Sequence, residues 1–321
     1  MTEARTEKPR IGFIGVGFMG HGMAKNLIEK GHAMQVIGNR NRQPVEDLLA
    51  RGATEAASPA AMAASVDIIH LCLPNSASVI HLCLPNSASV EAVMRGPDGI
   101  LAGARPGLIV IDTTTADPGS TVALAEDLAA RGGTLVDAPL GRTPKEAEAG
   151  TLDAMVGCDE ATFQRILPVI RCWAANINHV GPTGSAHKMK LIMNFIAMGY
   201  AALYAEALTT AAKAGIAPQT VQKVIGSSRM ANGFFETFMT GAVGRDREVH
   251  KFTITNAAKD LRYCAQMAMA GGMANPMGAA MRSMFAQAEA AGHGGDFVPQ
   301  LADLFAAANG LDLADAVKRG A

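Results

Sequence analysis

The feature that most constrains the fold is a set of three spaced glycines near the start of the chain. Residues 10–14 are apolar enough for a short buried strand, and Gly15, Gly17 and Gly20 follow them directly. The residues after the glycines have the apolar spacing of a helix, and a second apolar segment, 34–38, comes next. This order of strand, glycine-rich turn, helix and strand is typical of an α/β protein that binds a dinucleotide.

The glycine-rich turn has a physical reason to contact a pyrophosphate. Glycines let the backbone approach the phosphates, and the N-terminus of the following helix supplies N–H donors and the positive end of its dipole. An ordinary tight turn in another kind of α/β protein is the alternative interpretation. We expect five residues of the turn to contact the dinucleotide: Gly15, Gly17, Phe18, Met19 and Gly20.

The end of the second strand indicates which dinucleotide is bound. An acidic residue at this place would bind the ribose 2′-hydroxyl of NAD. The sequence instead has Asn39, Arg40 and Arg42, with no acidic residue before Glu46. Arginine side chains can bind a 2′-phosphate through charge-assisted hydrogen bonds. We therefore expect Asn39 and Arg40 to contact the cofactor and NADP(H) to be favoured. If both arginines are solvated loop residues, NAD(H) is used as well.

An unusual repeat follows. Residues 69–79 occur a second time, without any change, at 80–90. A single undiverged copy is not the signature of a solenoid, and two copies cannot occupy one strand position. Ligands bind at the carboxyl ends of strands in open α/β sheets, so extra residues before a strand harm a site less than extra residues after it. We therefore expect residues 80–85 to form the strand and residues 69–79 to be displaced.

Strand and helix patterns alternate as far as residue 181, which predicts a doubly wound, mostly parallel sheet. From Ser185 to about Gly215 the sequence predicts one long helix with apolar side chains on every face. The rest of the chain is rich in Ala and Met at helical spacing. We predict the α/β class, with a Rossmann domain at residues 1–183 and an all-helical domain at residues 184–321, and the long helix joins them.

Composition and charge narrow the functional class. A chain of 321 residues that is 49% hydrophobic can form two domains. The formal net charge of −1, without a basic cluster, argues against a nucleic-acid partner. We find no apolar run long enough to span a membrane and no signal peptide in the charged N-terminal residues. The cysteines lack metal-ligand spacings, so we expect reduced thiols, a cytoplasmic protein and no metal.

The long helix carries one candidate for chemistry. Lys190 and Asn194 are four residues apart in its most apolar part, which places an amine and an amide on the same face. On spacing alone, a lysine that buries its stem and keeps its charge in water is the more ordinary explanation of the pair.

Five stretches, in order, resemble the β-hydroxyacid dehydrogenase family, which includes 3-hydroxyisobutyrate dehydrogenase. They are residues 12–20, a Leu-Pro-Asn after a strand, residues 112–118, residues 137–152 and residues 181–194, and Lys-Asp-Leu at 259–261 lies beyond them. The resemblance covers nearly the whole chain. It implies a nicotinamide-dependent oxidoreductase that commonly forms homodimers or homotetramers through its helical domain.

The resemblance also implies roles for individual residues. The lysine that matches Lys190 is the family's catalytic acid/base, and the amide that matches Asn194 helps to hold the substrate. The family's remaining matched positions imply cofactor contacts from Leu84, Pro85, Thr115 and Lys259, and substrate contacts from Gly141, Arg142 and Thr143.

Lys259 and Asp260 have an alternative interpretation in which neither belongs to the site. They would also suit a solvated pair on a helix, although the ordered motifs favour a site role for Lys259.

His187, three residues before Lys190, could relay a proton, but we interpret it as structural because the family motif does not need a histidine there.

Two departures from the family pattern bear on the substrate. Most members have Ser-Gly-Gly where this chain has Gly141, Arg142 and Thr143, and the arginine adds a planar fork of donors with a full positive charge. Gly-Arg-Thr is similar to the version found in sulfolactaldehyde reductases. The alternative interpretation is that Arg142 points into solvent and does not contact the substrate. Met193 replaces the first amide of the usual Lys-x-x-Asn-Asn pattern and removes a polar contact.

The sequence therefore predicts an NADP-preferring oxidoreductase that interconverts a small acidic 3-hydroxy compound and its aldehyde. A sulfonate such as sulfolactaldehyde is the most specific expectation, and a carboxylate semialdehyde is the alternative within the class. An imine reductase has a similar layout, but would carry Asp or Tyr in place of Lys190. A protein that binds the cofactor without turnover is the alternative outside the class.

Overall fold

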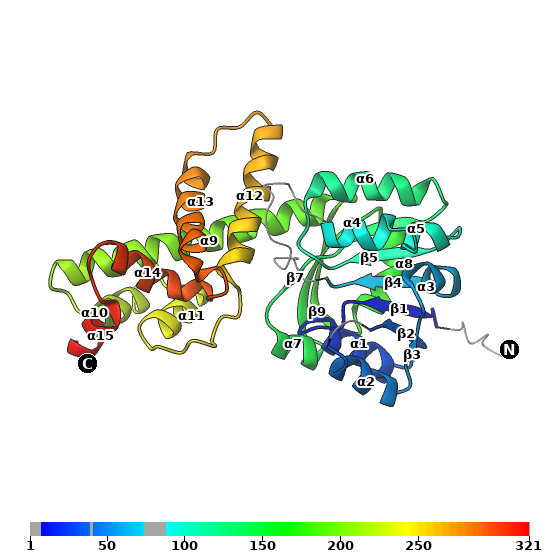
Figure 1. The fold of residues 1–321 in the computed structure, drawn as a ribbon, viewed down its shortest axis with the longest axis horizontal. Coiled ribbons are helices and arrows are strands. Elements are labelled where there is room, and N and C mark those ends of the chain that lie inside the picture. The colour runs from blue at the N-terminus through cyan, green and yellow to red at the C-terminus, as the bar shows by residue number, and fades with distance from the viewer. Residues whose placement is uncertain (1–7, 39–40, 74–87, 321) are drawn as a thin grey trace. The chain divides into compact units, whose positions relative to one another are not determined.

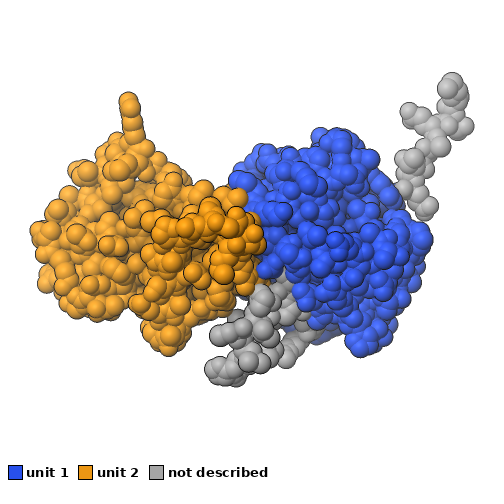
Figure 2. All heavy atoms as spheres, turned by 90° about the horizontal axis from the view of Figure 1, so that it is seen from above, with its two compact units in different colours: residues 1–190 blue, residues 191–321 orange. Residues whose placement is uncertain are grey.

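The computed structural model describes residues 8–38, 41–73 and 88–320. The chain divides into two compact units, Met1–Lys190 and Leu191–Ala321, which Figure 2 colours separately. The division falls inside one long helix, so no loop separates the two units. The domain boundary expected between residues 183 and 184 lies earlier in the chain and stays a prediction.

The described residues of the first unit form a nine-stranded sheet (Figure 1). Its strands pair in the order β3-β2-β1-β4-β5-β6-β8-β7, and β9 pairs with β8. Neighbours from β3 to β6 are parallel, whereas β8 is antiparallel to β6 and β7. This topology confirms the predicted doubly wound, mostly parallel Rossmann sheet. The strands are β1 (Ile11–Ile14), β2 (Met34–Ile37), β3 (Thr54–Glu55), β4 (Ile68–Leu71), β5 (Ile109–Asp112), β6 (Thr134–Asp137), β7 (Leu140–Gly141), β8 (Leu152–Gly157) and β9 (Ala174–Gly181).

Helices cover both faces of the sheet, so its central strands are apolar on both sides. In β4, Ile68 packs into the core beneath α1, α2 and α8, while Ile69 and Leu71 pack into the core beneath α3 to α6 (Figure 1). The helices are α1 (Gly20–Glu29), α2 (Gln43–Ala50), α3 (Pro59–Ser65), α4 (Ala88–Arg95), α5 (Ile100–Gly103), α6 (Pro118–Ala129), α7 (Pro144–Ala149) and α8 (Glu160–Ile170).

The first copy of the repeat forms strand β4, so the expectation that residues 80–85 form it is wrong. Ile69 lies in the sheet interior, opposite Gly12 on β1 and Val110 on β5. The physical reason lies just before the strand. Asp67 accepts a hydrogen bond from the backbone N–H of Arg10 at 2.9 Å, and its own N–H bonds the carbonyl oxygen of Arg10 at 2.9 Å. Only the first copy follows Asp67, so this contact sets its register beside β1.

Hydrogen bonds at the other end of β4 hold the same register. The N–H and the hydroxyl of Thr113 both donate to the carbonyl oxygen of Leu71, at 2.8 and 2.7 Å. The hydroxyl of Thr114 accepts the N–H of Leu73 at 3.3 Å. Helix α4 begins at Ala88, inside the second copy, so the additional residues lie between β4 and α4 and not before the strand.

Helix α9 (Ser185–Lys213) confirms the predicted long helix. Its end is fixed by Gly215, which adopts a φ of 80° and donates its N–H to the carbonyl oxygen of Ala212. By length and mean hydropathy, α9 is the one helix of the described residues that could cross a membrane, contrary to the expectation from the sequence that no run is long enough. A core helix of a soluble protein passes the same test.

The second unit is helical, as predicted. A core of Ala, Phe, Leu and Met side chains from its helices packs around the C-terminal part of α9. Asn232, Thr253 and Asn275 cap three of these helices with their side chains. The helices are α10 (Pro218–Gly226), α11 (Gly233–Ala242), α12 (Ile254–Ala270), α13 (Pro276–Ala288), α14 (Leu301–Ala308) and α15 (Leu313–Arg319).

Candidate active site

The turn after β1 has the geometry of a phosphate-binding loop. Gly15 has a φ of 98°, and a Cβ on it would lie 2.2 Å from the carbonyl oxygen of Cys72. A Cβ on Gly20 would lie 2.1 Å from the carbonyl oxygen of Gly15, so glycine there allows α1 to pack closely. Apart from Gly17 itself and its two chain neighbours, no described atom lies within 4 Å of the place where a Cβ on Gly17 would be. In a dinucleotide-binding fold, the first glycine allows the tight turn, the second lets the backbone come close to the pyrophosphate, and the third lets the helix pack closely. The surroundings of Gly15, Gly17 and Gly20 fit these three roles in that order.

The residues between the glycines lead into the N-terminus of α1. Phe18 is 89% exposed, and Met19 precedes the first residue of the helix. The imidazole of His21, in the first turn, lies between two carboxylates, with Glu148 at 2.7 Å and Asp47 at 2.9 Å. These contacts tie α1 to α2 and α7 and hold the start of the helix in place.

The end of β2 carries a feature that the sequence did not predict. Asn39 and Arg40 lie outside the described residues, but the guanidinium of Arg42 donates hydrogen bonds to both carboxylate oxygens of Glu55, at 2.7 and 2.8 Å. This hydrogen-bonded pair raises the pKa of Arg42 and lowers the pKa of Glu55. The N–H of Gly38 also donates to Glu55, at 3.2 Å. Strand β3 therefore brings an acidic residue to the tip of β2.

The segment that follows β5 lies beside the end of β4. Thr115 is half-buried, directly after the threonines that bond to Leu71 and Leu73. Leu84 and Pro85, the expected cofactor contacts after the strand, lie outside the described residues. Because the first copy forms β4, Leu73 stands where Leu84 was expected to stand. Burial raises the pKa of the neighbouring Cys72 thiol to about 11.

The predicted substrate loop is held by its own neighbours. Gly141 pairs with Asp153 across β7 and β8, and the Nε of Arg142 donates to Asp153 at 2.8 Å. Thr143 precedes α7 and donates both its N–H and its hydroxyl to Glu146. Arg142 is half-exposed and has a φ of 76°, a left-handed conformation that costs a non-glycine residue roughly 1–2 kcal/mol.

One buried carboxylate fixes the start of α9. Asp137, at the end of β6, accepts hydrogen bonds from the N–H groups of Gly184 at 2.7 Å and His187 at 2.8 Å. The Nδ1 of His187 lies 2.7 Å from the hydroxyl of Thr121, and the histidine is fully buried. These contacts agree with a structural histidine. They also set the rotation of the helix turn that carries Lys190, which is half-buried.

In the second unit, Asn194 lies against α12. Its amide nitrogen donates to Asp260 at 2.5 Å, and the ammonium of Lys259 lies 2.9 Å from the other oxygen of Asp260. Lys259 and Asp260 are both buried, so the alternative of a solvated pair is wrong. The ammonium of Lys259 also lies 5.2 Å from the ring centroid of Tyr263.

Two family models together match nearly the whole chain. Residues 10–181 match the NAD binding domain of 6-phosphogluconate dehydrogenase, and residues 184–304 match the NAD-binding domain of NADP-dependent 3-hydroxyisobutyrate dehydrogenase. The chain belongs to the 3-hydroxyisobutyrate dehydrogenase-like β-hydroxyacid dehydrogenase family. It is therefore an NAD(P)-dependent hydroxyacid dehydrogenase or reductase, as the sequence predicts.

Relatives of this family align along most of the chain. A 2-(hydroxymethyl)glutarate dehydrogenase of Eubacterium barkeri is 34% identical over 89% of this chain and 91% of its own length. A 3-sulfolactaldehyde reductase of Escherichia coli K12 is 32% identical over 88% and 91%. A solved 3-hydroxyisobutyrate dehydrogenase of Mycobacterium tuberculosis is 26% identical, with a TM-score of 0.79 over 92% of this chain and 98% of its own.

The sequence analysis assigns no site role to four acidic residues near the site, namely Glu55, Asp137, Asp153 and Asp260. Asp137 and Asp260 lie within stretches that resemble the family, and this is the feature of the sequence that could have indicated a site role for them. Glu55 and Asp153 have no such feature, because only the pairing of β3 with β2 and of β8 with β7 brings them to the site. Within the described ranges, no three His, Cys, Asp or Glu residues are grouped closely enough to hold a metal ion.

Proposed function

We propose that this enzyme interconverts a small acidic 3-hydroxy compound and its aldehyde, with Lys190 as the acid/base. The observation that carries the proposal is the register of α9. Asp137 fixes the first turn of the helix through two backbone N–H groups, and Lys190 and Asn194 follow on one helix face. The hydrogen bond to Asp260 supports a site role for Asn194.

The residue types suit the chemistry. The bound nicotinamide dinucleotide supplies the hydride in the reducing direction and accepts it in the other. Reduction of an aldehyde develops negative charge on the carbonyl oxygen, and the ammonium of Lys190 stabilises that charge and donates the proton. In the oxidising direction, the neutral amine of Lys190 takes the proton of the hydroxyl group. Asn194 holds the substrate beside the lysine, and Thr115 and Lys259 contact the cofactor.

NADP(H) is the favoured cofactor in this proposal. The turn at Gly15, Gly17 and Gly20 receives the pyrophosphate, together with the backbone of Phe18 and Met19. Arg40 and Asn39 contact the 2′-phosphate, and the family model that matches residues 184–304 is described as NADP-dependent. NAD(H) use is the alternative, and it is supported by the engagement of Arg42 with Glu55.

Arg142 is the proposed anchor for the acidic end of the substrate, with Gly141 and Thr143 beside it. A similar relative is named 3-sulfolactaldehyde reductase, which supports a sulfonate as the anion. Another is named 2-(hydroxymethyl)glutarate dehydrogenase, which supports a carboxylate as the alternative. The bond from Nε to Asp153 accounts for one of the five N–H donors of the guanidinium.

The test is NADPH oxidation with a panel of sulfonate and carboxylate aldehydes, with NADH measured in parallel. Lys190→Ala should lower kcat roughly 10²–10⁴-fold with the best substrate and leave the Kd for NADPH within threefold of the wild-type value. Lys188→Ala is the matched control, because this lysine is exposed on the same helix two residues earlier. Near-normal turnover by Lys190→Ala would remove the lysine from the mechanism.

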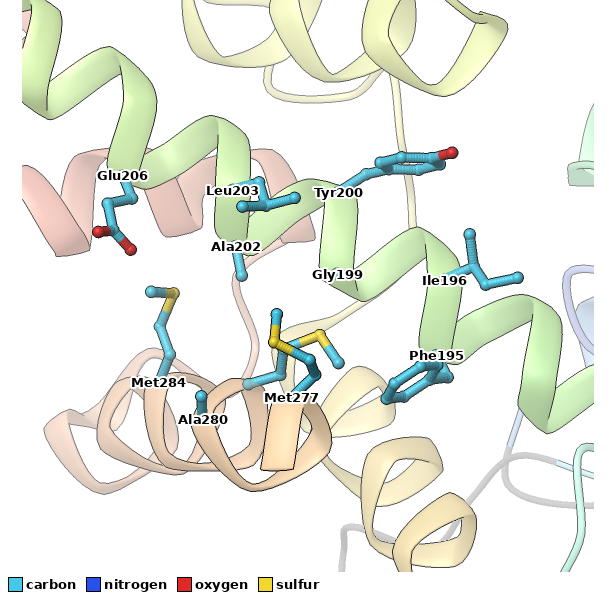
Figure 3. Close-up of a pocket in the computed structure, with 11 residues that line it drawn as sticks. Phe195, Ile196, Gly199, Tyr200, Ala202, Leu203, Glu206, Met277, Ala280 and Met284 are labelled. Carbon is cyan, nitrogen blue, oxygen red and sulfur yellow. The ribbon is translucent and has the colours of Figure 1, made fainter. Parts of the chain in front are cut away.

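The same proposal places the enzyme in the cytoplasm as a homodimer or homotetramer. Ile192, Ile196 and Leu203 are exposed apolar side chains of α9 at spacings of four and seven residues, which is typical of a helix that packs against a second helix. Ile196 and Leu203 also line a pocket of about 270 Å³ formed by α9 and α13, and Glu206 is the one charged residue among its otherwise mostly apolar lining (Figure 3). A second copy of the chain would cover this surface. Leu203→Glu should then lower the molar mass measured by sedimentation equilibrium.

A further inference from the structure

We propose that Asp260 is a positioning residue for the reaction, and that its carboxylate orients Asn194 and Lys259 together. This inference rests on the proposed function, which gives those two residues their contacts with substrate and cofactor. Asp260 reaches both from one place on α12, because one carboxylate oxygen faces α9 and the other faces the neighbouring lysine. No other role for this carboxylate is assigned by the mechanism.

The distances set the arrangement. Oδ2 of Asp260 accepts a hydrogen bond from Nδ2 of Asn194 at 2.5 Å. Oδ1 lies 2.9 Å from the ammonium nitrogen of Lys259, and no donor among the described residues has hydrogen-bond geometry to Oδ1. The first contact is therefore a directed, charge-assisted hydrogen bond, and the second is held by charge. The carboxylate is 2% exposed, so water does not weaken either interaction.

The carboxylate dictates which way the amide of Asn194 faces. An ionised carboxylate only accepts hydrogen bonds, so the amide must turn its nitrogen toward Asp260. The carbonyl oxygen of Asn194 is then directed away from Asp260 and is available as an acceptor. An acceptor on this face of α9 suits the ammonium of Lys190, one turn earlier, and the hydroxyl group of a substrate. A neutral side chain at position 260 would allow either orientation of the amide.

The energetics argue against a purely structural role. Burying two opposite charges costs several kcal/mol of desolvation per ion, and apolar replacements of buried ion pairs are often neutral or stabilising. The surroundings are apolar, since Leu191, Tyr263 and Cys264 form a buried cluster between α9 and α12. A buried pair of charges is therefore weak evidence of a contribution to stability. It does hold a lysine and an amide in fixed orientations.

The first experiment is a double-mutant cycle on kcat with the best aldehyde found for the wild-type enzyme. Asp260→Asn keeps the shape of the side chain and removes its charge, and we expect kcat to fall roughly 10–100-fold. Asn194→Ala removes the oriented amide. Because both changes abolish the same orientation, the double variant should have a kcat within threefold of the slower single variant. Losses that multiply, or a kcat for Asp260→Asn within threefold of wild type, would overturn the proposal.

A second cycle does not depend on turnover and so separates this inference from the proposed function. The Kd for NADPH is measured by fluorescence for Asp260→Asn, Lys259→Ala and the double variant. We expect Asp260→Asn to raise the Kd at least threefold, and the double variant to bind no more weakly than Lys259→Ala. An unchanged Kd in Asp260→Asn, or additive losses, would contradict a role through Lys259 even if no substrate were turned over.

The control separates positioning from general destabilisation. Asp303→Asn removes a carboxylate of the same unit that bonds Arg245 at 2.8 Å and Arg247 at 2.8 Å. Both aspartate variants are compared with wild type after their folded fractions are matched by circular dichroism. We expect Asp303→Asn to keep the wild-type kcat and Kd. Equal losses in the two variants would mean that Asp260 acts only on stability, and the proposal would be wrong.

Discussion

Glu55 accepts hydrogen bonds from both terminal nitrogens of Arg42, at 2.7 and 2.8 Å. A 2′-phosphate on the cofactor would compete with this carboxylate for the same guanidinium. Glu55→Gln removes the competing charge and should raise the ratio of kcat/KM for NADPH over NADH roughly three- to tenfold, as expected for one exposed charge. Steady-state kinetics with both cofactors measures the ratio. A ratio that stays constant would show that Arg42 does not contact the cofactor.

Arg142 should decide how strongly an anionic substrate is bound. Arg142→Ala removes the proposed anchor and should raise the KM for a sulfonate aldehyde roughly 10–100-fold, with a smaller change in kcat. Arg142→Lys keeps the charge without the planar fork and should recover only part of the loss. Initial rates over a range of substrate concentrations separate the two parameters. If Arg142→Ala and wild type prefer the same substrates with equal KM, the anion is bound elsewhere.

Asp137 should contribute strongly to stability through the start of α9. In Asp137→Asn an amide N–H₂ group replaces one acceptor oxygen and faces a backbone N–H donor, which should cost about 2–3 kcal/mol of unfolding free energy. Urea denaturation measures the change. Asp159→Asn is the matched control, because asparagine caps a helix about as well as aspartate. Equal stability of the two variants would contradict the capping role of Asp137.

His70 should make the protein less stable in mild acid. It is fully buried between Phe13 and Trp173, and burial lowers its pKa from 6.5 to about 3. Between these values the unfolded chain binds a proton that the folded chain does not, so the unfolding free energy falls as the pH falls. The slope is about 1.4 kcal/mol per pH unit, or about 2 kcal/mol from pH 6.5 to pH 5.

The measurement is urea denaturation at several pH values for wild type and His70→Leu. The variant should lose this part of the pH dependence, whatever its stability at neutral pH. An unchanged slope in His70→Leu would show that another group is responsible.

Removing one copy of the repeat should stabilise the protein. Deletion of residues 69–79 gives the same polypeptide as deletion of 80–90, and it leaves the residues of β4 and α4 unchanged. The connection between β4 and α4 shortens from 16 residues to 5, which lowers its closure entropy by about 1 kcal/mol. Thermal unfolding of both proteins measures the effect. A less stable shortened protein would mean that the additional copy makes contacts of its own.

Local patterns in the sequence predicted most of the fold. The spaced glycines, the alternation of strands and helices, and the long helix each depend on neighbours in the chain, and each was confirmed. The choice between the two copies of the repeat was wrong because identical residues carry no local difference. The contact between Asp67 and Arg10, which decides the choice, joins residues far apart in the sequence.

The candidate site was predicted only as far as the family motifs extend. These motifs predict site roles for Lys190, Asn194 and Lys259, but they do not predict which residues interact with those side chains. Asp260 and Asn194 are 66 residues apart in the sequence, and only the packing of α12 against α9 joins them. The left-handed backbone of Arg142 was likewise not visible, because the sequence gives no sign that an arginine takes a conformation suited to glycine.

The connection between β4 and α4 already carries an insertion of eleven residues. Strand β4 and helix α4 keep their full sequences although the repeat adds eleven residues to the connection between them. Foreign residues exchanged for 77–87 would therefore leave both elements intact. A reporter peptide could be placed there, in the connection between the strand and the helix that follow one another in the chain.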